Sequence, residues 1–540
     1  MKLQYWGVAA VFAAMPALAQ QRYLRGVNIS GAEWGSNTLP GQLGREYTFS
    51  SEKTYQYFAA KGLGLVRLPI LWERIQPVAR GPLDPDYLAL VKRSAAWANA
   101  SGGQVFIEIH NFARYRGVVT NEADLADLWA RLSQEFQGNT GVWAYDLMNE
   151  PHDMGSANWK AISQAAVTAI RGRGDNTLIL VPGNGWSGAG TWVQNNGATS
   201  WIQDPANNFM YEAHTYFDSD NSGTYVRSYD EELARDPNLP DRGPARLKVF
   251  VDWCRQNNVP GFLGEFGLPW GDVRWMTVLE RFLAALDDAG MGGAYWAAGD
   301  WWENYIIGIQ PLSGYTVDRP QMPILQRHLA PGYLINVSAA SFAGWIFAPG
   351  SWVTSFGSRL EGDLELTDSA GQAFRVMPSY ASATQINYLV PEEAALGRIT
   401  AVVQREGKTT GQGVFWLERV APALFTATFD GQGVPAGQLL RIKADGTRAF
   451  ETLAQPIEFL EAGERLFLIL YGTGIRRASS TLLSLGKETA SITFAGAQGE
   501  YAGLDQVNAE VPRTAAGSGK VDVVLLADNK AANTVTLEFQ

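Results

Sequence analysis

Two glutamates in this sequence follow apolar runs of strand length, a position where a carboxylate can carry out acid–base chemistry. Glu150 ends the run 142–149 and precedes Pro151, which stops the strand and fixes the turn. Glu265 ends a second run, 260–264. A pair of carboxylates can cleave a glycosidic bond, because one protonates the leaving oxygen while the other attacks the anomeric carbon. The sequence therefore predicts that the two glutamates face each other across a sugar-binding cleft.

The apolar runs along the first part of the chain indicate a fold that would bring the two glutamates together. From residue 23 to about 329, eight runs of strand length alternate with helical periods. The predicted strands are 24–28, 65–68, 105–110, 142–149, 177–181, 209–214, 261–265 and 293–296, and the predicted helices include 87–99, 122–136, 159–170, 246–256 and 275–287. This alternation predicts an α/β protein with a (β/α)8 TIM barrel, whose functional residues lie at the carboxyl ends of the strands. The first strand is not followed by a glycine-rich phosphate turn, which argues against a dinucleotide-binding sheet.

Charged side chains stand where such a barrel would place its active face. Arg67, His110 and His214 each lie at the end of a predicted strand. An arginine there can hold a carboxylate ionised, although an isolated arginine is more often a surface residue, and each histidine alone is more often a core residue. Two histidines and two glutamates could instead bind zinc. We expect no metal and no cofactor, because the sequence has no HExxH pair and Asn-Glu-Pro has no role in binding a metal.

Motifs at every predicted strand end are similar to those of one known family. They are RGVNISGAEWG (25–35), VRLPILWERIQP (66–77), EIHNFARYRG (108–117), YDLMNEPH (145–152), PGNGWSGAGTW (182–192), EAHTYFDSDNSGT (212–224), FLGEFG (262–267) and YWAAGDWWENY (295–305). On these motifs residues 25–329 resemble glycoside hydrolase family five, in the clan of retaining barrel hydrolases, and most of all its fungal-type endo-β-1,4-glucanases. Two departures are Trp34, where phenylalanine is usual, and Thr215, where relatives often carry glutamine.

The resemblance implies a role for each residue of the site. It makes Glu150 the general acid/base and Glu265 the nucleophile, with Arg67 holding the nucleophile in place. It also implies substrate-binding residues around this pair, namely Asn149 at the sugar 2-hydroxyl, His110, His214 and Tyr216 in the reacting subsite, Trp296 as its stacking floor, and Asn111, Trp186 and Trp192 in neighbouring subsites. The charge of Glu265 would keep Glu150 protonated until the glycosyl-enzyme forms, so we expect a bell-shaped pH profile with an acidic optimum.

Length and composition limit the number of domains and the kinds of partner that the sequence allows. With 540 residues the chain is too long for one hydrophobic core, so two or three domains are expected. The formal charge of −11 and the lack of a basic patch argue against nucleic acid as a partner. The 19 tryptophans fit either large cores or platforms for sugar rings. The single cysteine, Cys254, excludes an internal disulfide, and we expect it to be a buried thiol.

The first residues have the pattern of a targeting segment. Lys2 precedes an apolar run, 6–15, and the sequence Ala17-Leu18-Ala19 fits a cleavage site. We therefore predict a signal peptide over residues 1–19, with cleavage near Ala19–Gln20 and a secreted or cell-surface protein. The run is too short to span a membrane, and no later stretch is long and apolar enough to do so. We expect a monomer whose partner is a β-glucan polysaccharide.

From about residue 334 the pattern changes to short β-branched and aromatic runs between glycine and proline turns. It predicts a catalytic domain at 20–331 and an all-β module at 332–540. The segment 380–391 recurs at 501–512 with the same spacing of Gln, Asn and Val-Pro, so two sandwich-like halves are expected, about 332–425 and 426–540. The motifs NVSAASF, APGSWVTSFGSRL, TQINYLVP and APALFT resemble a C-terminal domain of secreted soil-bacterial proteins. Its tryptophans, Trp345, Trp352 and Trp416, could bind polysaccharide or lie in sandwich cores.

Four alternatives to an endo-β-1,4-glucanase stay open at this point. A β-mannanase, a xyloglucanase or a mixed-linkage glucanase would use the same two glutamates, with loop residues deciding between substrates. A glycan-binding or adhesion protein is the alternative outside the enzymes, with an inactive barrel and a functional β-module. The intact pair Glu150 and Glu265 argues against the last possibility.

Overall fold

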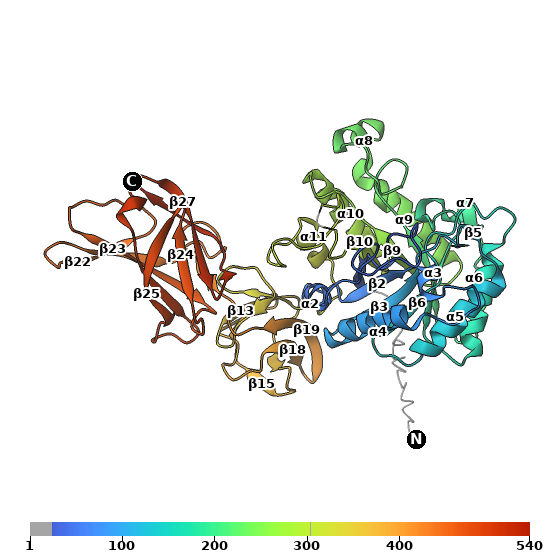
Figure 1. The fold of residues 1–540 in the computed structure, drawn as a ribbon, viewed down its shortest axis with the longest axis horizontal. Helices are drawn as coiled ribbons and strands as arrows, with labels where there is room; N and C mark the ends of the chain where they lie inside the picture. Colours follow the sequence, from blue (N-terminus) through green and yellow to red (C-terminus); the bar gives the residue numbers. More distant parts are fainter. Residues whose placement is uncertain (1–23, 303) are drawn as a thin grey trace, which may run out of the picture.

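The computed structural model describes residues 24–302 and 304–540. The predicted signal peptide, residues 1–19, lies outside the described residues. Figure 1 shows a barrel at one end of the molecule and two all-β units that follow it in the chain and extend away from it. Among the described residues no helix has the length and apolar character needed to cross a membrane.

The N-terminal part is a closed barrel of eight parallel strands. Its strands are β1 (Arg25–Ile29), β2 (Leu65–Ile70), β3 (Gln104–Ile109), β6 (Val142–Asp146), β7 (Leu178–Pro182), β8 (Phe209–His214), β9 (Gly261–Phe266) and β10 (Gly292–Ala298). They pair in the order β1-β10-β9-β8-β7-β6-β3-β2, and β2 returns to β1. All strand residues except Gln104 and Trp296 are buried, as expected for strands covered on both faces. The predicted TIM barrel is confirmed.

Helices surround the barrel, and four of those described begin at a residue whose side chain caps them. They are α2 (Glu52–Ala60), α3 (Trp72–Ile75), α4 (Pro85–Ala100), α5 (Glu122–Phe136), α6 (Trp159–Gly172), α7 (Trp192–Asn196), α8 (Tyr229–Arg235), α9 (Leu239–Gln256), α10 (Arg274–Asp288) and α11 (Gln321–Arg327), with a 3-10 turn at Ala189–Thr191. The Asn121 side chain accepts from two backbone N–H groups at the start of α5, and Asp84 caps α4, whose first residue is a proline. A short hairpin, β4 (Arg114–Tyr115) with β5 (Val118–Val119), lies after β3.

Helix α9 differs most from its prediction. It begins at Leu239, seven residues before the predicted start at residue 246, and continues through Gly243 and Pro244. These two residues normally disfavour a helix, which is why the pattern predicted a later start. Gly243 is required by packing, because a Cβ there would lie 2.4 Å from the ring of Phe217. Tertiary packing thus overrides local propensity at this point.

The C-terminal region begins with a two-sheet sandwich. A four-stranded sheet has the order β11-β13-β17-β16, and a five-stranded sheet has the order β12-β19-β18-β14-β15. The strands are β11 (Ile335–Ser338), β12 (Ile346–Phe347), β13 (Trp352–Phe356), β14 (Asp363–Thr367), β15 (Ala373–Val376), β16 (Tyr380–Ala381), β17 (Gln385–Leu389), β18 (Gly397–Arg405) and β19 (Lys408–Leu417). Their alternating inward side chains, such as Val353 and Ile399, form one core.

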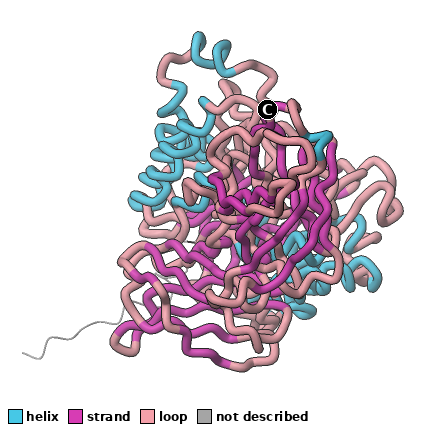
Figure 2. The backbone as a smooth tube through the Cα atoms, turned by 90° about the vertical axis from the view of Figure 1, so that its left-hand side faces the viewer, coloured by secondary structure: helices cyan, strands magenta, loops and turns pink. Residues whose placement is uncertain are grey.

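The second all-β unit is a single curled sheet in the order β22-β21-β23-β26-β25-β24-β27-β28, with β20 and β29 pairing at β23 and β27. The strands are β20 (Ala423–Leu424), β21 (Gly437–Ile442), β22 (Arg448–Thr452), β23 (Arg465–Thr473), β24 (Thr481–Leu485), β25 (Glu488–Ala497), β26 (Asp505–Glu510), β27 (Gly519–Ala527), β28 (Lys530–Ala531) and β29 (Val535–Phe539), with a 3-10 turn at Arg513–Ala515. It encloses a core of its own. Figure 2 shows the strands of these all-β units in the foreground, with the helices behind them.

The sequence repeat has a structural counterpart in the two units. In the first unit Gln385 donates a hydrogen bond to Asn387 on β17 (2.9 Å), and in the second Gln506 donates to Asn508 on β26 (2.7 Å). Each of these strands pairs antiparallel with an earlier strand of its own unit, β17 with β13 and β26 with β23. The predicted all-β region is thus found, while its division into two related sandwich-like halves and the domain boundaries stay predictions.

Two of the tryptophans that sequence left open as polysaccharide binders are buried between the first sandwich and the barrel. Trp345 and Trp416 are 3% and 7% exposed, and their rings lie 5.5 Å apart. Trp345 also packs 5.9 Å from Tyr57 of α2 and donates its indole N–H to the backbone oxygen of Tyr315 (3.1 Å). Trp352 donates its N–H to Ala502 O, a contact between the two all-β units. Trp345 and Trp416 therefore serve packing, and Trp352 links the two all-β units.

Candidate active site

The barrel interior is built in layers, because alternate residues of each strand point inward. At its base lie apolar side chains, including Leu65, Phe106, Ala144, Met210 and Phe262. Two residues further along β2, β3, β6 and β8 the interior positions are charged, and they are Arg67, Glu108, Asp146 and Glu212, none of them exposed. Two residues further still, β3 and β8 lead to His110 and His214. A buried charged layer therefore supports the rim at the carboxyl ends of the strands.

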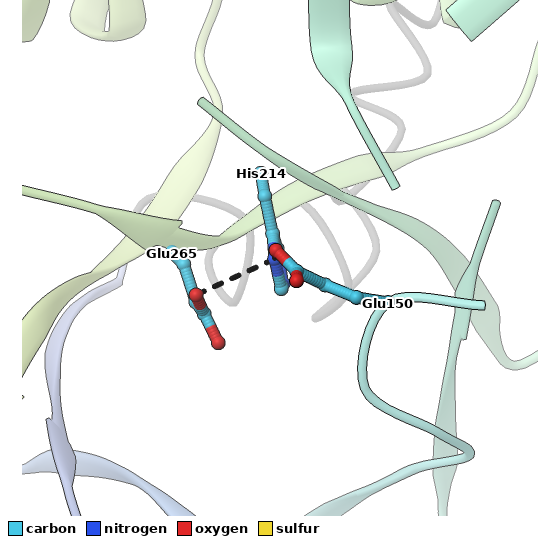
Figure 3. A group of neighbouring side chains, drawn as sticks. All are labelled: Glu150, His214 and Glu265. Carbon is cyan, nitrogen blue, oxygen red and sulfur yellow. Dashed lines mark hydrogen bonds and ion pairs between the residues drawn. The ribbon is translucent and has the colours of Figure 1, made fainter. Parts of the chain in front are cut away.

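Glu150 and Glu265 meet at this rim, as the sequence predicted. Glu265 lies on β9, and Glu150 follows β6 in a turn where its φ of +40° places the backbone in the left-handed region. One carboxylate oxygen from each residue lies within 4.8 Å of the other. The side chain of Glu150 is 18% exposed and that of Glu265 only 4%. Figure 3 shows both carboxylates beside the ring of His214.

Both oxygens of Glu265 accept hydrogen bonds from fixed donors. Arg67 Nη1 donates to Oε1 at 2.6 Å, and the Tyr216 hydroxyl donates to Oε2 at 2.7 Å. Burial by itself would raise the pKa of Glu265, but the charges of His214 and Arg67 outweigh it and hold this pKa below its ordinary value. The carboxylate is therefore kept ionised and oriented, the state that a nucleophile requires.

Arg67 connects the carboxylate to the charged layer below. Its Nε donates to Asp146 at 2.8 Å and its Nη2 donates to the side-chain oxygen of Asn149 at 3.1 Å. The burial of Asp146, more than the neighbouring charges, raises its pKa well above the ordinary value. The planar guanidinium thus fixes the Glu265 carboxylate and the Asn149 amide in one rigid unit.

His110 lies on the other side of the Asn149 amide. Asn149 Nδ2 is 3.3 Å from His110 Nε2, and the other ring nitrogen, Nδ1, is 2.9 Å from Glu108 Oε2. Burial of the ring lowers the pKa of His110, but Glu108 and the more distant Glu33 and Glu265 raise it to about 8 overall. Below that pH the ring carries a positive charge beside the buried carboxylates.

His214 stands between three carboxylates. Its Nδ1 is 2.8 Å from Glu150 Oε1 and 3.5 Å from Glu265 Oε2, while its Nε2 is 2.7 Å from Glu212 Oε1. Burial opposes the charged form of the ring, but Glu212, Glu265 and Glu150 raise the pKa of His214 well above its ordinary value. The donor atoms of Glu150, His214 and Glu265 are close enough together to hold a metal ion. A doubly protonated ring has no lone pair for a metal, so acid–base chemistry suits this group better.

Aromatic rings border the reacting pair. Trp296 stacks near-parallel on His110 (5.6 Å, 16°) and donates its N–H to the Tyr305 hydroxyl (3.2 Å). Trp186 stacks on His152 (4.6 Å, 9°) and is 49% exposed. An open indole face of this kind is suited to packing against a sugar ring. Trp296 therefore lies beside His110 at the rim and Trp186 beside His152, and their roles in substrate binding stay a prediction.

Two residues predicted for neighbouring subsites have other contacts. Asn111 accepts a hydrogen bond from Trp72 N (2.7 Å) and donates one to Glu73 (2.7 Å), so both ends of its amide are used within the protein. We infer that it supports the rim. Trp192 is fully buried and packs on Phe250, so it does not reach the surface of the site. The pattern GWSGAGTW could not distinguish this buried indole from the exposed one at 186, because only the tertiary fold separates them.

The sequence analysis missed the carboxylates of the charged layer. Glu108, Asp146 and Glu212 all precede a predicted site residue, and two of them form the pattern Glu-x-His, at 108–110 and 212–214. In a strand, residues two apart share a face, so this repeated pattern signals a carboxylate beneath a histidine. The signal was present in the sequence, although its meaning depends on which face points into the barrel.

Comparison with known proteins agrees with this geometry. Residues 26–301 match the cellulase family, glycosyl hydrolase family 5. A probable endo-β-1,4-glucanase B of Neosartorya fischeri is 34% identical over 294 residues, which cover 54% of this chain and 86% of that protein. Endo-β-1,4-glucanase B of Emericella nidulans is 32% identical over the same shares of the two chains.

Solved structures of endoglucanases are also similar to this chain. An endoglucanase of Pseudomonas stutzeri crystallised with cellobiose is 37% identical, with a TM-score of 0.53 over 57% of this chain and 92% of that one. An endo-β-1,4-glucanase of Xanthomonas axonopodis pv. citri is also 37% identical, with a TM-score of 0.52 over 57% and 98%. The fold and the site define a barrel glycoside hydrolase. The chain belongs to glycosyl hydrolase family 5, a retaining family of clan A.

Proposed function

We propose that the protein is an endo-β-1,4-glucanase that hydrolyses cellulose or related β-glucans with retention, using Glu150 as general acid/base and Glu265 as nucleophile. The observation that carries the proposal is the separation of the two carboxylates, whose facing oxygens lie within 4.8 Å. Retaining enzymes hold their carboxyl groups about 5–5.5 Å apart, while inverting ones leave a wider gap for water. The similarity to endo-β-1,4-glucanases supports the choice of substrate.

The first step transfers the sugar to the enzyme. A carboxylate oxygen of Glu265 attacks the anomeric carbon as the bond to the leaving oxygen breaks, and Glu150 gives its proton to that oxygen. The product is a glycosyl ester of Glu265 and a free chain end. Arg67 and Tyr216 hold the Glu265 carboxylate for this attack. Asn149, fixed by Arg67, is placed to bond the 2-hydroxyl of the reacting sugar.

The second step returns the enzyme to its starting state. Glu150, now ionised, takes a proton from water, whose oxygen attacks the anomeric carbon while the bond to Glu265 breaks. Two inversions leave the β-configuration unchanged. Trp296 would form the floor of the reacting subsite, with His110 and His214 on its walls, and Trp186 would stack a sugar further along the chain.

Hydrolysis of cello-oligosaccharides followed by NMR tests the proposal, because the anomer formed and the bond cleaved are observed together. We expect the β-anomer first and cleavage at internal bonds. Parallel assays on mannan, xyloglucan and mixed-linkage glucan test the alternative substrates. Release of the α-anomer first, or binding of glucan without hydrolysis, would contradict the mechanism.

Variants of the two glutamates test the roles separately. Glu150→Gln should lower kcat by roughly 10²–10⁴-fold, and less on a substrate whose leaving group needs no proton. Glu265→Gln should abolish the covalent intermediate that a 2-deoxy-2-fluoro glycoside traps on the wild-type enzyme, detected by mass spectrometry of the intact protein. A Glu150→Gln variant as active as the parent on cellulose would refute the assignment.

We also propose a division of the chain into a signal peptide (1–19), a catalytic domain (20–331) and a β-module (332–540). The observation behind the second boundary is the change from barrel to sandwich strands between α11 and β11. Export is testable by the N-terminal sequence of protein recovered from the culture medium, which should begin near Gln20. The protein is expected to elute as a monomer in gel filtration.

A further inference from the structure

The pattern Glu-x-His on β8 places Glu212 next to His214, a residue of the proposed site. Glu212 and His214 are two apart on one strand, so their side chains share the interior face of the barrel. Glu212 is fully buried, and His214 is 1% exposed. Glu212 takes part in neither bond making nor bond breaking in the mechanism above. A buried carboxylate in this position needs a reason, because burying a charge without compensation is costly.

The compensation for the Glu212 charge is the ring of His214. Glu212 Oε1 and His214 Nε2 form an ion pair at 2.7 Å. The contact lacks the alignment of a hydrogen bond, and within the described residues no other group forms a hydrogen bond to either atom, so the attraction between the two charges helps to offset their burial. The other oxygen of Glu212 accepts a longer hydrogen bond from the Ser187 hydroxyl (3.3 Å). The carboxylate is thus held against the ring and away from solvent.

The opposite side of the ring faces the reacting pair. His214 Nδ1 is 2.8 Å from Glu150 and 3.5 Å from Glu265. With a carboxylate close to each nitrogen, the charges around the ring favour the imidazolium form. Figure 3 shows the ring of His214 next to the carboxylates of both glutamates. Three charged groups therefore face the ring, namely Glu212 of the buried charged layer and Glu150 and Glu265 of the rim. Arg67 contacts Glu265 and not the ring.

We propose that Glu212 is a positioning residue that keeps His214 doubly protonated, so that His214 serves as counter-ion to Glu265 before the glycosyl transfer and to Glu150 after it. The inference rests on the proposed two-step function. In the free enzyme Glu265 carries the negative charge. Once the sugar is bound to Glu265 as an ester, that charge is gone, and Glu150 has given up its proton. One fixed cation near both carboxylates can then stabilise the charge at either position without moving.

Space for the Glu212 carboxylate is provided by a glycine on the next strand. A Cβ at Gly264 would lie 1.5 Å from Glu212 Oε1, although the backbone of Gly264 is not in the left-handed region. The requirement for glycine is therefore steric. Gly264→Ala would displace the carboxylate from His214 while keeping every charge of the site, and it offers a second way to break the ion pair.

The chain contains a matched control in the same pattern on β3. Glu108 and His110 are also two apart, and Glu108 Oε2 is 2.9 Å from His110 Nδ1. The second nitrogen of His110 faces the amide of Asn149 rather than a carboxylate (3.3 Å). Glu108→Gln therefore removes a buried charge of the same layer without touching the partner of His214.

The experiment measures the ring protonation directly. The chain has four histidines, so ¹⁵N-labelled imidazole signals can be resolved by NMR and assigned with single His→Gln variants. We expect His214 in the wild-type full chain to stay imidazolium from about pH 5 to about pH 8. In Glu212→Gln and in Gly264→Ala the ring should lose a proton within this range, while in Glu108→Gln its signal should stay as in the wild type.

Kinetics separate positioning from simple structural support. In Glu212→Gln we expect kcat on cello-oligosaccharides to fall about tenfold or more, and its alkaline limb to move to lower pH by about one unit. A neutral His214 in the wild type near pH 6, or an unchanged imidazolium and pH profile in Glu212→Gln, would overturn the inference. The wild-type titration decides this even where a variant fails to fold. A failure of the proposed function would instead appear as wild-type protein that hydrolyses no β-glucan.

Discussion

Arg67 donates a 2.6 Å hydrogen bond from Nη1 to Oε1 of Glu265, although the two residues are 198 positions apart in the sequence. The guanidinium is completely enclosed, and the carboxylate is 4% exposed. A charged pair so well shielded from water must be complete, because removing one partner leaves the other charge buried and unpaired. Glu265 is therefore tied to the core of the barrel.

Replacing Arg67 by lysine keeps the positive charge but should still impair the orientation of Glu265. A lysine ammonium cannot reproduce the planar fork that bonds Glu265, Asn149 and Asp146 at once. We expect Arg67→Lys to lower kcat/KM roughly 100-fold, the cost of a small misplacement. Arg131→Lys is the control, since Arg131 pairs with Asp127 on the surface and should change little. Activity near the wild-type level in Arg67→Lys would show that the planar guanidinium of Arg67 is not required.

The hydroxyl of Tyr216 should set the acidic limit of activity. It donates to Glu265 Oε2 and helps keep the pKa of this carboxyl low. In Tyr216→Phe that pKa should rise, so the acidic limb of kcat/KM should move to higher pH. Tyr295→Phe serves as the control, because Tyr295 is equally buried but bonds Leu268 instead. The same displacement in both variants would show that the effect is structural.

His110 should make stability depend on pH between neutral and mildly alkaline conditions. Its pKa is about 8 in the folded protein, against about 6.5 in an unfolded chain. A raised pKa means that the charged ring stabilises the fold fully below about pH 6.5, and that this stabilisation is lost as the pH rises through about 8. The loss is at most about 2 kcal/mol.

Denaturant titrations at about pH 6 and about pH 9 would measure this dependence. The wild-type free energy of unfolding should fall more between these values than that of His110→Gln. Equal falls in the two proteins would assign the dependence to other groups.

Trp186 should contribute to substrate binding and not to the chemical step. Its exposed ring, stacked on His152, offers one face to a sugar. We expect Trp186→Ala to raise KM for cello-oligosaccharides about tenfold, a loss of about 1.4 kcal/mol, with a smaller change in kcat. Phe429→Ala removes an aromatic ring that is 75% exposed on the β-module and should leave KM unchanged. A fall in kcat alone would place Trp186 in the chemistry instead.

Trp345 should couple the first sandwich to the barrel. The residue is 3% exposed and shares one core with Tyr57 and Trp416. Trp345→Ala should lower the free energy of unfolding by about 3–5 kcal/mol and separate the unfolding of barrel and sandwich. Differential scanning calorimetry would show this as an additional transition at lower temperature. Phe450→Ala, at an exposed position of β22, is the comparison that should change little.

The sequence by itself determined the barrel, the all-β region and the two glutamates. Strand-length apolar runs separated by helical periods leave few other folds, and a carboxylate at the end of a buried strand, beside a proline, stands out without coordinates. Cys254 was likewise predicted as a buried thiol, and it is buried and unpaired with a pKa raised by burial to about 12.

Only the tertiary structure decided how the charges are arranged. Sequence could not show that Arg67, Glu108, Asp146 and Glu212 form one buried layer, because that depends on which face of each strand points into the barrel. It could not separate the exposed Trp186 from the buried Trp192, nor place Trp345 at the barrel. Local patterns fix secondary structure, whereas the distances that govern charge and burial arise only when remote segments meet.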